Sequence, residues 1–140
     1  MMKKNAATMF SKIRNAINAM IVSELEQRGI EGIVSSHGDI LWALYIQDMQ
    51  PITALSEKID RTQPTVTVLV NKLDKLGYVR KVKSKEDSRI TLVSLTPKGR
   101  ELEPVFREVS NRLNETLYGG LSEGEQVQLE SLLERILKRF

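Results

Sequence analysis

The fold is decided by residues 62–97, which read TQPTVTVLVNKLDKLGYVRKVKSKEDSRITLVSLTP. Apolar side chains recur in the first half at steps of three and four, at Val66, Leu69, Val70, Leu73 and Leu76. This spacing predicts a helix with one buried face, which Thr62 can cap and Gly77 can end. The period then changes to that of two strands, 78–82 and 90–95, joined by a charged turn. A helix followed by a β-hairpin is therefore predicted.

Helices are expected on both sides of this segment. Before it, one apolar stripe over about residues 9–28 predicts a first helix. A second helix is expected to start at Ser35 or Ser36, and a short third helix to be capped by Thr53. The short third helix, the 62–76 helix and the hairpin follow one another in the order of a winged helix-turn-helix.

Two further helices are expected after the hairpin. Thr96-Pro97 is typical of a helix start, and Pro104 predicts an interruption shortly afterwards. Ser122 and Glu125 have the spacing of a capping box that opens a last helix. The predicted fold class is mainly α with a small β-hairpin wing, a winged helix-turn-helix within an all-helical dimer.

The side of the 62–76 helix that its core stripe leaves free carries small polar groups, one small apolar group and one cation. We call this set the reading face: Gln63, Pro64, Thr65, Thr67, Val68, Asn71 and Lys72. Amides and hydroxyls can bond base edges or phosphates, and no acidic side chain intervenes before Asp74. The reading face is therefore predicted to bind duplex DNA.

The hairpin supports a nucleic-acid partner. Residues 72–100 carry a net charge of +6, whereas the whole chain carries +3, and such a concentrated basic segment favours a polyanion. The predicted DNA-binding residues of the wing are Lys81, Lys83, Lys85, Asp87 and Arg89. Arg89 can enter a minor groove, and Asp87, two residues earlier, can hold its guanidinium in place.

Four motifs in this order resemble the MarR (multiple antibiotic resistance regulator) family: Thr65-Val66-Thr67, Leu76-Gly77-Tyr78-Val79-Arg80, Asp87-Ser88-Arg89 and Val93-Ser94-Leu95-Thr96-Pro97-Lys98-Gly99. The resemblance extends over nearly the whole chain. It implies a homodimeric transcriptional regulator of pseudo-palindromic operators, with repression favoured, and it makes Asp87 and Arg89 the wing-tip pair. Members often have an arginine directly after the position of Thr67. Val68 stands there in this chain, which implies a different sequence preference.

One domain is expected over residues 1–140, with its DNA-binding part at about 34–97 and dimerisation helices at about 1–30 and 98–140. Apolar residues near the C-terminus, such as Phe140, would be exposed on a monomer and favour a dimer. The resemblance also implies a small aromatic or anionic ligand between the dimer helices and the winged part. Candidate ligand residues are Phe10, Arg14, His37, Trp42 and Tyr45. Their alternative roles are packing for the aromatic side chains, a solvated charge for Arg14 and, for His37, a satisfied residue near a helix start.

Composition argues against several other functions. Without cysteine there is no disulfide, thiol sensor or thiolate metal cluster, and the single histidine disfavours a zinc site. We expect no cofactor, no metal and no enzymatic activity, because no catalytic motif is evident. No apolar stretch approaches the roughly 20 residues of a membrane span, so a cytoplasmic protein without a membrane partner is expected. The alternative function is a winged-helix protein–protein interaction module, which would favour an acidic or apolar reading face and a neutral wing.

Overall fold

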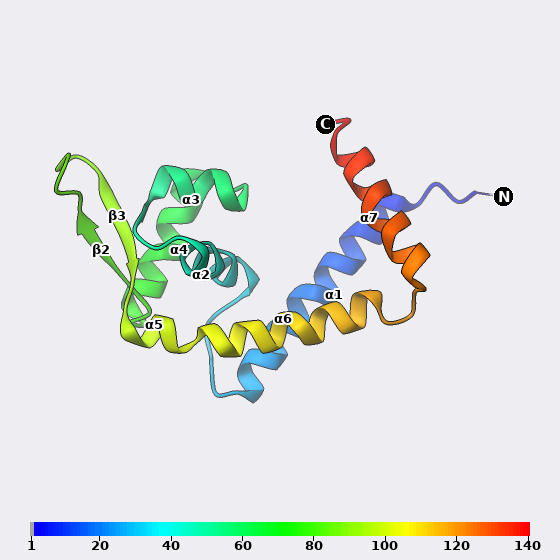
Figure 1. Cartoon of the computed structure of the whole chain (residues 1–140), viewed down its shortest axis with the longest axis horizontal. Helices are drawn as coiled ribbons and strands as arrows, with labels where there is room; N and C mark the ends of the chain where they lie inside the picture. Colours follow the sequence, from blue (N-terminus) through cyan, green and yellow to red (C-terminus); the bar gives the residue numbers. More distant parts are fainter. Residues whose placement is uncertain (1) are drawn as a thin grey trace. The chain divides into compact units, whose positions relative to one another are not determined.

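Helices and one small sheet make up residues 2–140, the part of the chain that the computed structural model describes. The elements are α1 (Ala6–Gln27), α2 (Ser35–Ile46), β1 (Gln50–Pro51), α3 (Ile52–Ile59), α4 (Gln63–Lys75), β2 (Val79–Lys83), β3 (Thr91–Leu95), α5 (Pro97–Glu101), α6 (Glu103–Tyr118) and α7 (Glu123–Leu137). The chain divides after Val109 into two compact units, and α6 runs from the first into the second. Figure 1 shows the β2–β3 hairpin beside α4. The predicted mainly helical fold with a winged helix-turn-helix is confirmed.

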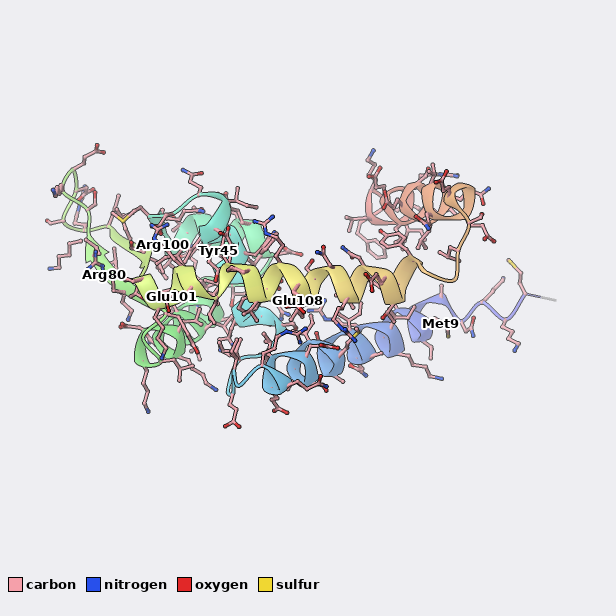
Figure 2. All side chains as sticks on the ribbon, turned by 60° about the horizontal axis from the view of Figure 1, so that its bottom comes forward. Met9, Tyr45, Arg80, Arg100, Glu101 and Glu108 are labelled. Atoms are coloured by element: carbon pink, nitrogen blue, oxygen red, sulfur yellow. The ribbon has the colours of Figure 1, made fainter. Side chains whose placement is uncertain are left out.

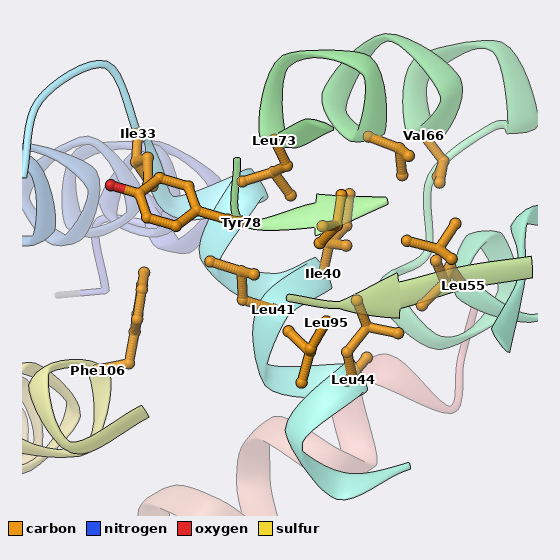
Figure 3. Packing of buried hydrophobic residues seen from close by; sticks show 14 of the residues in the cluster. Ile33, Ile40, Leu41, Leu44, Leu55, Val66, Leu73, Tyr78, Leu95 and Phe106 are labelled. Atoms are coloured by element: carbon orange, nitrogen blue, oxygen red, sulfur yellow. The ribbon is translucent and has the colours of Figure 1, made fainter. Parts of the chain in front are cut away.

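The core of the first unit lies between α2, α3, α4 and the sheet. Val66, Val70 and Leu73 of α4 are fully buried, as the helical spacing predicted. They belong to one cluster with apolar side chains of α2 and with Leu55 of α3 (Figure 3). Burying each such side chain contributes about 1.5–3 kcal/mol, so this cluster fixes which side of α4 faces solvent.

Both ends of α4 follow the local signals in the sequence. The Thr62 hydroxyl oxygen accepts a hydrogen bond from the Thr65 N–H (3.4 Å), and Pro64 lies in the first turn, where its missing N–H costs nothing. Gly77 has a φ of +85°, a conformation that only glycine adopts without strain. A threonine cap contributes about 1 kcal/mol, so the start of α4 is well defined.

The sheet has three antiparallel strands in the order β1-β3-β2. The predicted hairpin is confirmed, with Val79 opposite Leu95 at its base and Lys83 opposite Thr91 near its tip. The short strand β1 was not predicted, because two residues are too few for a periodic signal. Its Pro51 is tolerated because β1 lies at the edge of the sheet.

Two predicted helix caps are wrong. The second helix begins at Ser35, but neither Ser35 nor Ser36 is its N-cap: Val34 is, and its N–H donates to Nδ1 of His37 (3.0 Å). The third helix begins at Ile52, directly after β1, which places Thr53 inside the first turn. At α2 the local contact of Val34 with His37 therefore replaces the serine caps, whereas α3 follows directly on β1, which is paired with β3.

The helices after the hairpin begin as predicted. The Thr96 hydroxyl accepts a hydrogen bond from the Gly99 N–H (3.1 Å) and caps α5, which ends before Leu102, so that Pro104 lies in the first turn of α6. In the second unit, Ser122 and Glu125 form the expected capping box at the start of α7. Within residues 2–140, no helix is both long enough and apolar enough to span a bilayer.

Candidate nucleic-acid interface

The reading face is exposed along its whole length. All seven members lie at the surface of α4: Gln63, Pro64, Thr65, Thr67, Val68, Asn71 and Lys72. The Thr67 hydroxyl donates to the carbonyl of Gln63 (2.9 Å), which leaves its oxygen available as an acceptor. Val68 is 69% exposed, so an apolar group stands among the polar ones, as contact with a thymine methyl would require.

The last two residues of the reading face, Asn71 and Lys72, contact different neighbours. Oδ1 of Asn71 accepts a hydrogen bond from Nζ of Lys81, which joins α4 to the hairpin. Lys72 extends instead toward the loop before α2, with its Nζ 3.6 Å from the position that a Cβ on Gly32 would occupy. Burial, and to a lesser extent Lys72, lowers the pKa of His37. The Lys72 side chain therefore lies beside the loop that joins α1 to α2.

The wing tip carries the predicted ion pair. Nε and Nη2 of Arg89 donate to the two carboxylate oxygens of Asp87 at 3.0 and 3.1 Å, and the Arg89 backbone N–H donates to Oδ1 at 3.0 Å. These bonds lower the pKa of Asp87 and raise that of Arg89. Because the Arg89 side chain remains 87% exposed, its guanidinium is oriented but still available to a polyanion.

The turn around this pair is itself ordered by hydrogen bonds. The Ser84 hydroxyl oxygen accepts from the N–H groups of Glu86 and Asp87 (3.2 and 3.4 Å), and the Ser84 N–H donates to the Ile90 carbonyl (2.9 Å). The remaining predicted wing residues, Lys81, Lys83 and Lys85, are all exposed. The hairpin therefore presents cations on a defined backbone.

Two basic residues that the sequence analysis did not select share these surfaces. Lys75 is exposed and lies seven residues after Val68, which places it on the same side of α4. Arg80 is exposed on β2, opposite Ser94 (Figure 2). Extending the helical period by one turn beyond Asn71 would have identified Lys75.

The base of the hairpin is anchored by residues far away in the sequence. Oδ1 of Asp48 accepts hydrogen bonds from the N–H groups of Leu95 and Met49 (both 2.9 Å), and Oδ2 pairs with Arg100 at 2.6 Å. The Tyr45 hydroxyl donates to the Gly99 carbonyl (2.7 Å), and Figure 2 labels both Tyr45 and Arg100. These contacts link α2 to the end of β3 and to α5.

The helix α5 also holds the turn between α4 and β2. Nζ of Lys98 donates to the Leu76 carbonyl (2.9 Å), and the Thr96 hydroxyl donates to the Gly77 carbonyl (2.5 Å). Gly99 packs so closely that a Cβ there would lie 2.0 Å from the Tyr78 carbonyl oxygen. The C-terminal end of α4 is therefore fixed by α5 and its N-cap residue Thr96.

The candidate ligand residues are only partly brought together. Trp42 and Tyr45 are in edge-to-face contact with ring centres 6.1 Å apart, and burial raises the pKa of Tyr45. Nδ1 of His37 is occupied by the cap of α2, while Phe10 and Arg14 are exposed on α1. A ligand site formed by these five residues stays a prediction.

Residues 34–91 match the model of the MarR family. These residues are a MarR family domain. The match spans all elements from α2 to β2, the hairpin tip and the first position of β3. It therefore includes every residue of the reading face and of the predicted wing set. The resemblance that the sequence motifs indicated is thereby confirmed.

Relatives of this MarR domain include two curated regulators. The chain is 26% identical over 98 residues to the HTH-type transcriptional regulator SarZ of Staphylococcus haemolyticus, with 70% of this chain and 65% of SarZ covered. It is 30% identical over 105 residues to the uncharacterized HTH-type transcriptional regulator YdgJ of Bacillus subtilis, with 75% of this chain and 64% of YdgJ covered. The matched part is thus just under two thirds of the length of each relative.

Among solved structures, the S. aureus MepR–DNA complex has a TM-score of 0.88 to this chain at 26% identity, covering 96% of this chain and 97% of MepR. That structure holds a protein of this fold in a complex with DNA. The family and the curated relatives are named as regulators of transcription and not as enzymes.

Proposed function

We propose that this protein is a sequence-specific, double-stranded DNA-binding transcriptional regulator, with repression as its favoured mode. The observation that carries the proposal is the reading face, exposed and free of acidic groups, next to a hairpin whose Arg89 is held ready by Asp87. A solvated helix face more often mixes acidic and basic groups at four-residue spacing. A surface of this chemistry instead matches the grooves and phosphates of duplex DNA.

Each part of the surface has a role in this proposal. The exposed reading face of α4 enters the major groove, where the hydroxyls of Thr65 and Thr67 and the methyls of Val68 meet base edges. The free N–H groups at the start of α4 favour a phosphate there. Arg89 enters the adjacent minor groove, and Lys83 and Lys85 of the hairpin contact phosphates. The DNA complex of MepR, a protein of the same fold, supports DNA binding by this fold.

A homodimer on a pseudo-palindromic operator is the second element of the proposal. In the first unit, α1 exposes Met9, Phe10 and Ile13. In the second unit, α7 exposes Val127, Leu132, Leu133, Ile136 and Leu137, and Phe140 follows it. Apolar surface of this extent favours burial against another copy of the chain. A two-fold dimer would present two reading faces about one turn of DNA apart.

Truncation after Glu130 tests the dimer. It removes most of the exposed apolar groups of α7, so size-exclusion chromatography with light scattering should show monomers or aggregates where the full chain gives a dimer. A truncated protein that still forms a well-behaved dimer would contradict the proposed C-terminal interface.

Release by a small aromatic or anionic ligand is the third element. The edge-to-face pair of Trp42 and Tyr45 is joined to α5 by one hydrogen bond, which the Tyr45 hydroxyl donates to the Gly99 carbonyl. A ligand that displaced this pair would act on the helix that holds the end of α4. Titration of the protein–DNA complex with a panel of aromatic carboxylic acids, followed by fluorescence anisotropy, tests for release.

Selection of bound sequences from random duplexes tests the central proposal. We expect recovery of an inverted repeat whose half-sites are separated by about one helical turn. Recovery of no sequence, together with no salt-sensitive binding to any duplex, would favour the interaction module instead.

A further inference from the structure

The contact between Asn71 and Lys81 restricts what Asn71 can recognise. Asn71 is exposed on α4, one turn beyond Thr67 and on the same side of the helix. Nζ of Lys81, in β2, donates a hydrogen bond to Oδ1 of Asn71. This bond joins a member of the reading face to a cation of the hairpin.

The chemistry of the two groups fixes the orientation of the amide. A carboxamide has one acceptor oxygen and one NH₂ group with two donors, whereas an ammonium group can only donate. Lys81 can therefore bond only the oxygen of Asn71, and this bond decides which way the amide points. Among the hydrogen bonds of residues 2–140, none uses Nδ2 of Asn71, so both of its donors remain open to a partner outside the chain.

An asparagine held in this way is unsuited to adenine. The usual bidentate contact needs the amide oxygen to accept from adenine N6 while the NH₂ group donates to N7. Here the ammonium group of Lys81 already occupies one lone pair of the oxygen and competes with adenine N6 for it, whereas Nδ2 has no partner within residues 2–140. Guanine offers two acceptors, O6 and N7, on the same edge. Nδ2 of Asn71 and the remaining protons of the Lys81 ammonium form a donor pair that suits this edge.

We propose that Asn71 and Lys81 act together to select guanine over adenine at one position of each half-site, with Lys81 as a specificity-determining residue. This inference rests on the proposed DNA-binding function. A bidentate base contact provides about five- to 150-fold discrimination against the wrong base, and most of it should depend on the Lys81 ammonium.

The strand supplies a matched control. Lys83 lies two residues after Lys81, so both side chains project from the same face of β2, and both are exposed. Only Lys81 bonds Asn71. Lys81→Met and Lys83→Met remove the same charge from the same strand, but only Lys81→Met releases the oxygen of Asn71.

The experiment is selection of bound sequences from random duplexes with the full-length wild type and both variants, with thermal unfolding confirming that each variant is folded. We expect a strong guanine preference at one half-site position, lost or reversed toward adenine in Lys81→Met and retained in Lys83→Met despite weaker binding. Two results would overturn the proposed guanine selection by Asn71 and Lys81 while leaving the regulator proposal intact. One is that Lys81→Met retains the same guanine preference. The other is a wild-type site that has adenine or no preference at every position. Failure of the wild type to bind any duplex would overturn the proposed function itself.

Discussion

Replacing Arg89 with alanine should change the salt dependence of DNA binding more distinctly than it changes stability. The Arg89 guanidinium is exposed and bonded only to Asp87, two residues away, so its removal leaves the core intact. Each cation that neutralises a DNA phosphate, including a guanidinium between the phosphates that flank the minor groove, steepens the fall of log K with log salt by about 0.9, because bound counterions are released. Removing one contact should therefore flatten the slope by that amount.

The expected magnitude depends on how many wings bind. Between 50 and 200 mM salt, the affinity ratio of wild type to Arg89→Ala should shrink by about 3.5-fold for one wing and about twelvefold for the two wings of a dimer. Fluorescence anisotropy with a labelled duplex, measured at several salt concentrations, gives both slopes directly. The size of the change thus also reports whether two wings contact the DNA.

Arg89→Lys is the matched control for this measurement. It retains the charge but loses the forked contact with both oxygens of Asp87. Its slope should equal that of the wild type while its affinity falls, because the side chain is no longer held in place before binding. Equal slopes for wild type and Arg89→Ala would refute the assignment of Arg89 to the DNA.

Three further substitutions and one control, Gly124→Ala, test the structure itself. Burial lowers the pKa of His37, so below pH 6.5 the unfolded chain takes up a proton that the folded chain does not, and the free energy of unfolding should fall by up to about 1.4 kcal/mol per pH unit. His37→Asn retains a cap acceptor without titrating, so urea unfolding at pH 5 to 7 should show a weaker dependence; an equal dependence would exclude His37 as its source. Gly99→Ala forces a Cβ against a backbone carbonyl and should cost about 1–3 kcal/mol, whereas Gly124→Ala, with open space around it, should be neutral or stabilising. Met49 is 45% exposed with a φ of +59°, so Met49→Gly should raise the melting temperature, and a lower one would show that its side chain contributes more than its strained backbone costs.

The sequence predicted those features that depend on neighbouring residues. The apolar spacing of α4, the cap at Thr62 and the turn at Gly77 are local signals, and each lies where it was expected. The Asp87–Arg89 pair was also expected, but the extended backbone that suggested it is absent: Ser88 and Arg89 lie in a turn closed by the Ile90 N–H on the Asp87 carbonyl. The exposure of the reading face then followed from the buried face of the same helix.

Contacts between distant residues could not be predicted in this way. Asp48 bonds a backbone N–H of Leu95, 47 residues later, and no local pattern marks it as an anchor. The bond from Lys81 to Asn71 likewise required the hairpin to be placed against α4. The alternative role of His37 as a satisfied residue near a helix start, by contrast, could be anticipated, because its partner Val34 lies only three residues away.

The attachment of α5 to the end of α4 has a mechanical consequence. Lys98, Thr96 and Gly99 all contact the turn from Leu76 to Tyr78, so α4 cannot tilt unless α5 tilts with it. In the proposed complex, the angle at which α4 meets the groove would therefore also depend on α5 and its contacts with this turn. An inhibitor that bound at the contact between α5 and the turn from Leu76 to Tyr78 would not have to compete with DNA for the basic surface of the protein.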